Sequence, residues 1–218
     1  MNSSTRLELT RAMGPSTVHV VCANAQQTQA GRLLDLVQAL TAQGALKHGM
    51  TLRLAGFDLR LLARSAASPS TTVFDLCEPD FGHAPQQEWR ADVSATLAWV
   101  AAQAALITRW GLSGREVHWH QKLVVARGAL LAHQLQAIRS TPLDEQDSGW
   151  CLSDSDHDAD PQDANAYEAM SVLAVLSQRP ELGSVLALPP GCAAVFEREQ
   201  LAALFDTEGQ LLWSGPEV

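Results

Sequence analysis

The chain has few cysteines, and they do not occur as pairs. Its 218 residues contain four cysteines, far apart along the chain: Cys22, Cys77, Cys151 and Cys192. Structural zinc sites usually contain CxxC pairs, and disulfide frameworks are typical of short, cysteine-dense secreted chains. We therefore expect reduced, separately buried thiols and no structural zinc.

Long apolar runs are also absent. None approaches the roughly 20 residues of a membrane-spanning helix, and residues 1–14 alternate polar and charged side chains, unlike the apolar core of a signal peptide. These absences predict a cytoplasmic protein that does not bind a membrane.

The sequence lacks the common signatures of enzymes. It contains no GxSxG, no GxxxxGK[ST], no GxGxxG after a strand and no HExxH. It also lacks a stripe of basic residues, which nucleic-acid binding requires. We expect a protein that is not an enzyme, needs no cofactor and does not bind nucleic acid.

Negative charge, in contrast, is abundant and concentrated. The chain has 24 acidic and 15 basic residues, a net charge of -9, and residues 140–178 contain nine of the acids and none of the bases. The rest of the chain is balanced, with 15 of each. A concentrated field of one sign is suited to attracting a partner of the opposite sign.

Within this segment, acids occupy alternate positions at Asp154, Asp156, Asp158 and Asp160, with His157 among them. Alternating oxygen ligands resemble the start of a calcium-binding loop, but neither possible frame provides the required glycine or the final glutamate. Three interpretations stay open: a solvated loop that caps a helix, a surface that recognises a basic partner, and another kind of divalent-ion site.

Two smaller groups of residues could also carry chemistry. If residues 117–119 form a strand, His118 and His120 point to one side and could begin a metal site, with Asp80, His83 or the acidic loop as a further ligand. Packing around Trp119 is the plainer interpretation. Glu78 and Asp80 lie in a proline-containing turn and could form an acid/base pair or contact a partner.

The hydrophobic periodicity predicts an α+β fold with mixed or antiparallel sheets and packed amphipathic helices. We expect helices over residues 28–43, 91–110 and 129–138, and another that begins at Asp160 and carries an apolar stripe from Tyr167 to Leu176. Residues 51–62 read as one strand with a β-bulge at Gly56. We expect a segment over 1–24 and lobes over 25–139 and 147–214, or one continuous domain.

Three motifs in the C-terminal half carry a resemblance to a known family. They are Asp147-Ser-Gly-Trp150, the acidic sequence Asp156-His-Asp158, and Leu186-Ala-Leu-Pro-Pro-Gly191, which reads as a strand followed by a turn. The chain resembles bacterial polymorphic-toxin immunity proteins of family thirty-three, over roughly residues 30–196. The motifs near the C-terminus are the more specific part of the likeness.

The resemblance implies an immunity protein that binds a cognate secreted toxin and inhibits it stoichiometrically. Together with the acidic segment, it indicates a toxin-contacting surface, with Glu78 and Asp80 at its edge and Trp150 as either a core residue or an interface anchor. The expected contact residues are Asp147, Trp150, Asp154, Asp156, His157, Asp158, Asp160, Glu78 and Asp80. The alternatives are a metal-dependent hydrolase that uses His118 and His120, and an adaptor or scaffold that delivers the toxin. The oligomeric state stays open.

Overall fold

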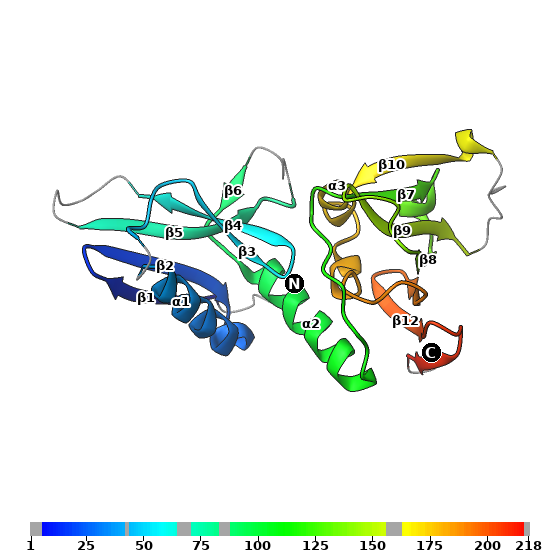
Figure 1. The fold of residues 1–218 in the computed structure, drawn as a ribbon, viewed down its shortest axis with the longest axis horizontal. Helices are drawn as coiled ribbons and strands as arrows, with labels where there is room; N and C mark the ends of the chain where they lie inside the picture. The colour runs from blue at the N-terminus through cyan, green and yellow to red at the C-terminus, as the bar shows by residue number, and fades with distance from the viewer. Residues whose placement is uncertain (1–5, 42–43, 65–70, 83–87, 156–162, 216–218) are drawn as a thin grey trace. The chain divides into compact units, whose positions relative to one another are not determined.

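A computed structural model describes residues 6–41, 44–64, 71–82, 88–155 and 163–215 (Figure 1). The chain divides into two compact units, residues 1–101 (unit 1) and 102–218 (unit 2). Each unit has its own sheet and at least one helix, in broad agreement with the expected α+β class, although strands are the larger share. In the part of the chain that is described, no helix is both long and apolar enough to cross a membrane.

Unit 1 has a mixed sheet of six strands in the order β1-β2-β5-β4-β3, with β6 paired to β5. The β2–β5 pair is parallel and the other pairs are antiparallel. Its elements are β1 (Arg6–Met13), β2 (Ser16–Ala23), η1 (Asn24–Gln26), α1 (Gln27–Thr41), β3 (Met50–Leu54), β4 (Phe57–Ala63), β5 (Thr72–Pro79), β6 (Trp89–Arg90) and the start of α2 (Ser94–Trp110).

The core of unit 1 lies between α1 and the sheet (Figure 1). Every second residue of β2 is buried, as expected for a strand with one covered face. Helix α1 agrees with the helix expected over residues 28–43, and its buried positions recur at helical spacing. The residues that meet in this layer include Val18, Val20, Cys22, Leu33, Leu34 and Val37.

The expected β-bulge at Gly56 is wrong, because β3 and β4 are two strands of a hairpin. Ala55 and Gly56 form its two-residue turn with φ angles of 49° and 84°. Positive φ at both turn positions matches the twist of the flanking strands. The slip in hydrophobic phase therefore marks a reversal of the chain, and Leu52 pairs with Leu59 across it.

Unit 2 has a sheet of seven strands in the order β10-β7-β9-β8-β11-β12-β13, in which only the β7–β9 pair is parallel. Besides the end of α2, its elements are β7 (Lys122–Ala126), η2 (Ala129–Leu131), β8 (Gln134–Arg139), β9 (Asp147–Asp154), η3 (Ala164–Ala166), β10 (Tyr167–Ser171), α3 (Val172–Leu176), η4 (Pro180–Ser184), β11 (Ala193–Glu197), β12 (Gln200–Phe205) and β13 (Leu211–Ser214).

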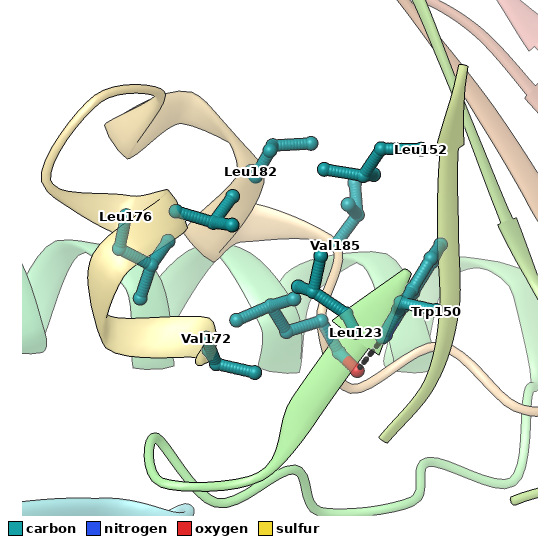
Figure 2. Close-up of a pocket in the computed structure, with 9 residues that line it drawn as sticks. Leu123, Trp150, Leu152, Val172, Leu176, Leu182 and Val185 are labelled. Carbon is teal, nitrogen blue, oxygen red and sulfur yellow. Dashed lines mark hydrogen bonds between the residues drawn. The ribbon is translucent and has the colours of Figure 1, made fainter. Parts of the chain in front are cut away.

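The core of unit 2 lies where α3 and η4 pack on the inner face of the sheet. Figure 2 shows apolar side chains from β7, β9, α3 and η4 converging on a small apolar cavity. Burial of such side chains is the main favourable contribution to folding. The labelled residues around this cavity are Leu123, Trp150, Leu152, Val172, Leu176, Leu182 and Val185.

The helix expected over residues 129–138 is wrong, because residues 129–131 form the short 3-10 helix η2 and residues 134–138 belong to β8. Strand β8 pairs with β9 on one side and β11 on the other. Its inward positions are Leu135, Ala137 and Arg139, which are buried at a spacing of two. Pairing on both edges therefore outweighs the local helix propensity of alanine and leucine.

The apolar stripe expected from Tyr167 to Leu176 is not one helix either. Residues 167–171 form β10, which pairs antiparallel with β7, and only residues 172–176 are helical, as α3. Ser171 begins α3 by accepting a hydrogen bond from the backbone N–H of Ala174. The expected helix start at Asp160 lies outside the described residues.

Residues 140–146, expected at the boundary between two lobes, connect β8 to β9. These two strands are antiparallel neighbours in one sheet. The two compact units meet in sequence at residues 101 and 102, within α2.

Candidate functional site

The Asp147-Ser-Gly-Trp150 motif begins β9 and shapes the turn before it. Asp147 is half-buried, and its Oδ1 accepts a hydrogen bond from the N–H of Gly149 at 2.7 Å. Its Oδ2 accepts another from the N–H of Leu143 at 2.8 Å, and Ser148 Oγ donates to the carbonyl of Lys122 at 2.8 Å. The first two polar side chains of the motif therefore hold neighbouring backbone in place.

Gly149 is required by close contact as well as by conformation. Its φ angle is +79°, and a Cβ atom added there would lie 2.2 Å from the carbonyl oxygen of Ser140. Any other residue at this position would push the turn away from β9. The glycine of the motif thus serves the fold.

Trp150 is a buried residue of the core of unit 2, in agreement with one of its two predicted roles. Its indole lines the apolar cavity, and its Nε1 donates a hydrogen bond to the carbonyl of Leu186 at 3.1 Å (Figure 2). A buried indole N–H needs such a partner. This bond connects the first motif to the motif that begins at Leu186.

Arg139 is buried and joins the same two motifs through backbone carbonyls. Its guanidinium donates to Ser148 at 3.2 Å, to Arg115 and Leu186 at 2.9 Å each, and also to Leu188. Burial, together with the nearby charge of Arg115, lowers the pKa of Arg139 to about 10. The group stays charged at neutral pH, so its bonds are charge-assisted.

The Leu186-to-Gly191 motif forms turns, so the strand expected at its start is wrong. The backbone of Arg139 also bonds to this part of the chain. The N–H of Gly191 donates to the carbonyl of Arg139 at 2.6 Å, and the N–H of Arg139 donates to the carbonyl of Cys192 at 3.0 Å. Gly191 has a φ angle of +96° and lies against Thr207. Sequence reasoning missed Arg139, although a spacing of two from Leu135 and Ala137 would have placed it on the inner face.

The predicted acidic contact residues lie only partly in the described chain. Asp154 is the last residue of β9 and is half-exposed. Asp163 caps η3 by accepting a hydrogen bond from the N–H of Asn165 at 2.9 Å. Asp156, His157, Asp158 and Asp160 lie outside the described residues, so their part in a contact surface stays a prediction.

Glu78 and Asp80 belong to unit 1. Glu78 is completely buried: its carboxylate accepts two bonds from Arg90, at 2.6 and 3.1 Å, and one from the N–H of Thr96 at 2.8 Å. Burial raises its pKa, while these donors lower it. Glu78 thus accepts a hydrogen bond from a backbone N–H in the first turn of α2, where the N–H groups have no partner within the helix. Asp80 Oδ1 accepts from the N–H of Gly82 at 3.0 Å.

His118 and His120 lie in a turn before β7, so the strand expected over residues 117–119 is wrong. Their rings stack nearly parallel, with centroids 5.6 Å apart. The turn is closed by Gln121, whose Oε1 accepts from the N–H of His118 at 2.8 Å. Within the described ranges, no group of three His, Cys, Asp or Glu residues is arranged to hold a metal ion.

Unit 2 is therefore a small α+β domain in which hydrogen bonds of Arg139 and Trp150 connect the motif at residues 147–150 to the motif at residues 186–191. Residues 102–206 match the family model of the Imm33-like domain. The match confirms the resemblance and covers β7 to β12, whereas the likeness expected from residue 30 onward includes unit 1, which lies outside the matched residues. Comparisons with curated proteins and with solved structures return no match.

Proposed function

We propose that this protein is an immunity protein that binds a cognate secreted bacterial toxin in the cytoplasm and neutralises it by stoichiometric inhibition, without catalysis. The observation that carries this proposal is the Imm33-like match over residues 102–206. Two motifs of that region, around Trp150 and Leu186, hold the fold together, as the bonds of Arg139 and Trp150 indicate. We therefore place recognition of the toxin on other parts of unit 2, including the acidic loop.

The distribution of charge supports unit 2 as the binding unit. Residues 102–218 contain 16 acids and 7 bases, whereas residues 1–101 contain 8 of each. The whole net charge of -9 therefore belongs to unit 2. Two of its bases, Arg139 and Arg179, are buried, so they are not available at its surface to contact a partner.

Arg179 is committed to internal contacts in the same way as Arg139. It donates to the carbonyls of Leu130, Ala132 and Arg198 at 3.2, 3.1 and 2.7 Å, and it pairs with Glu181. An acidic surface accelerates the approach of a basic partner and favours its binding. A toxin that attacks nucleic acid through a basic cleft fits this surface, and the acidic loop would compete there with phosphate.

The acidic loop can be tested by charge reversal. The double variant Asp156→Lys/Asp158→Lys should weaken binding of the toxin domain encoded beside this gene at least roughly tenfold, and added salt should slow association of the wild type. Calorimetry and stopped-flow fluorescence measure these effects. Glu8→Lys/Glu88→Lys is the matched control, because it makes the same charge change at exposed positions of unit 1. Equal affinities in both double variants would remove the loop from the interface.

Growth rescue tests the function as a whole. Co-expression with that toxin domain should restore growth, whereas an adaptor would leave the cells inhibited. The alternative is a metal-dependent hydrolase that uses His118 and His120. Metal analysis of protein purified without chelator tests it, because about one equivalent of bound transition metal would favour the hydrolase.

A further inference from the structure

A continuous row of apolar side chains crosses the outer face of the sheet in unit 2. Residues directly opposite each other in paired strands share one face. The strand register links one residue from each of the seven strands into a single line. From β10 to β13, this outer row consists of Ala169, Val124, Cys151, Ile138, Ala193, Phe205 and Leu211.

The outer row is accessible, although every member is apolar. The exposed fractions of Val124, Ile138 and Leu211 are 41%, 40% and 56%, and none of the other four residues is buried. The neighbouring residues in the strands, such as Leu123 and Leu152, point to the inner face and form the core. The sheet therefore carries an apolar row on its outer face as well as an apolar inner face, and the inner face is packed by α3 and η4.

The outer face of the sheet in unit 1 is different. It carries charged pairs, such as Arg53 with Asp58 at 2.9 Å and Arg64 with Asp75 at 2.7 Å. An antiparallel sheet with one solvated face normally has polar side chains there, as unit 1 does. An accessible apolar line across an entire sheet is typical of a surface that binds another protein.

The charge of unit 2 selects the kind of partner. A second copy of this chain would bring two units of net charge -9 against each other, which is unfavourable. A basic protein would gain from the same field. Protein interfaces commonly have an apolar centre and a polar or charged rim, and the outer row is flanked on the same face by polar residues such as Gln136 and Ser153.

We propose that the outer row is the centre of the toxin-binding surface, and that the toxin meets it with an exposed apolar strip surrounded by basic residues. The inference rests on the proposed function and names the surface through which the protein would bind the toxin. It places the main contact on the strands of the unit 2 sheet.

The test is calorimetric titration of full-length variants with the toxin domain encoded beside this gene. Val124→Lys/Ile138→Lys should weaken binding roughly 100-fold, because it places two cations at the centre of the contact. Two controls should bind within about twofold of the wild type: Leu36→Lys, a 41% exposed residue of α1 in unit 1, and Leu131→Lys, a 90% exposed residue of η2 in unit 2. Thermal unfolding should be alike in all variants.

The outcomes separate this inference from the proposed function. Wild-type affinity in a folded Val124→Lys/Ile138→Lys variant would overturn the docking surface alone, and growth rescue by the wild type would still support immunity. A wild type that neither binds nor rescues would overturn both. Sedimentation should show a monomer, and a dimer that the double variant disrupts would assign the outer row to self-association instead.

Discussion

Replacing Arg139 with methionine should destabilise unit 2 strongly, because its guanidinium holds four backbone carbonyls inside the unit. Leaving a buried acceptor without its donor costs about 1–3 kcal/mol. Part of this loss is offset, because a buried charge no longer has to be desolvated and methionine fills much of the volume. The expected net loss of unfolding free energy is about 3–5 kcal/mol.

Urea unfolding followed by tryptophan fluorescence and circular dichroism measures this loss. Trp150 lies beside the guanidinium, at 5.8 Å from its ring centroid, and therefore reports on the same region. The two units could unfold in separate steps, so both signals are needed. Arg109→Met is the matched control, because it makes the same chemical change at an exposed position and should shift stability by less than about 0.5 kcal/mol.

Arg139→Lys separates charge from geometry. Lysine keeps the charge but cannot reproduce the planar array of donors, so it should recover less than half of the lost stability. If Arg139→Met unfolds at the wild-type urea concentration, the guanidinium does not connect the two motifs in the way described. Full recovery by lysine would show that charge alone is sufficient.

Two further predictions concern unit 1. Ala55→Asn should raise stability by about 0.5–1 kcal/mol in the same urea experiment, because asparagine tolerates the positive φ of this turn better than alanine, and a decrease would contradict the assigned turn. Burial raises the pKa of Cys77 to about 12 from an ordinary 9.0, so iodoacetamide should label it at pH 8 only after unfolding. As pH rises, the Cys77 thiol loses its proton in the unfolded state before it does in the folded state, so unit 1 should lose stability between pH 9.0 and about 12. Rapid labelling of the native protein would contradict the burial of Cys77.

The sequence predicts those features that depend on local patterns. Helix α1 is recognisable from its apolar spacing, and the resemblance based on the motifs around Trp150 and Leu186 agrees with the family-model match over residues 102–206. Residues 129–138 mislead because alanine and leucine favour helix, while the two neighbouring strands that decide the outcome are distant in sequence.

Other features depend on contacts that no single segment reveals. Glu78 reads as a turn carboxylate, yet it lies at the buried N-terminus of α2, next to Arg90. The outer row is harder still to predict, because its members come from seven strands and align only once the register is known. A residue such as Ile138 has no distinguishing mark in the sequence.

The most direct test of the account is a titration of toxin activity. Increasing amounts of the full-length protein are mixed with a fixed amount of the toxin domain encoded beside this gene, and the toxin's own activity is measured after equilibration. Stoichiometric inhibition predicts a linear loss of activity that ends at one equivalent, independent of incubation time. Complete loss at a small fraction of an equivalent, progressing with time, would indicate catalysis, and undiminished toxin activity at excess protein would contradict immunity.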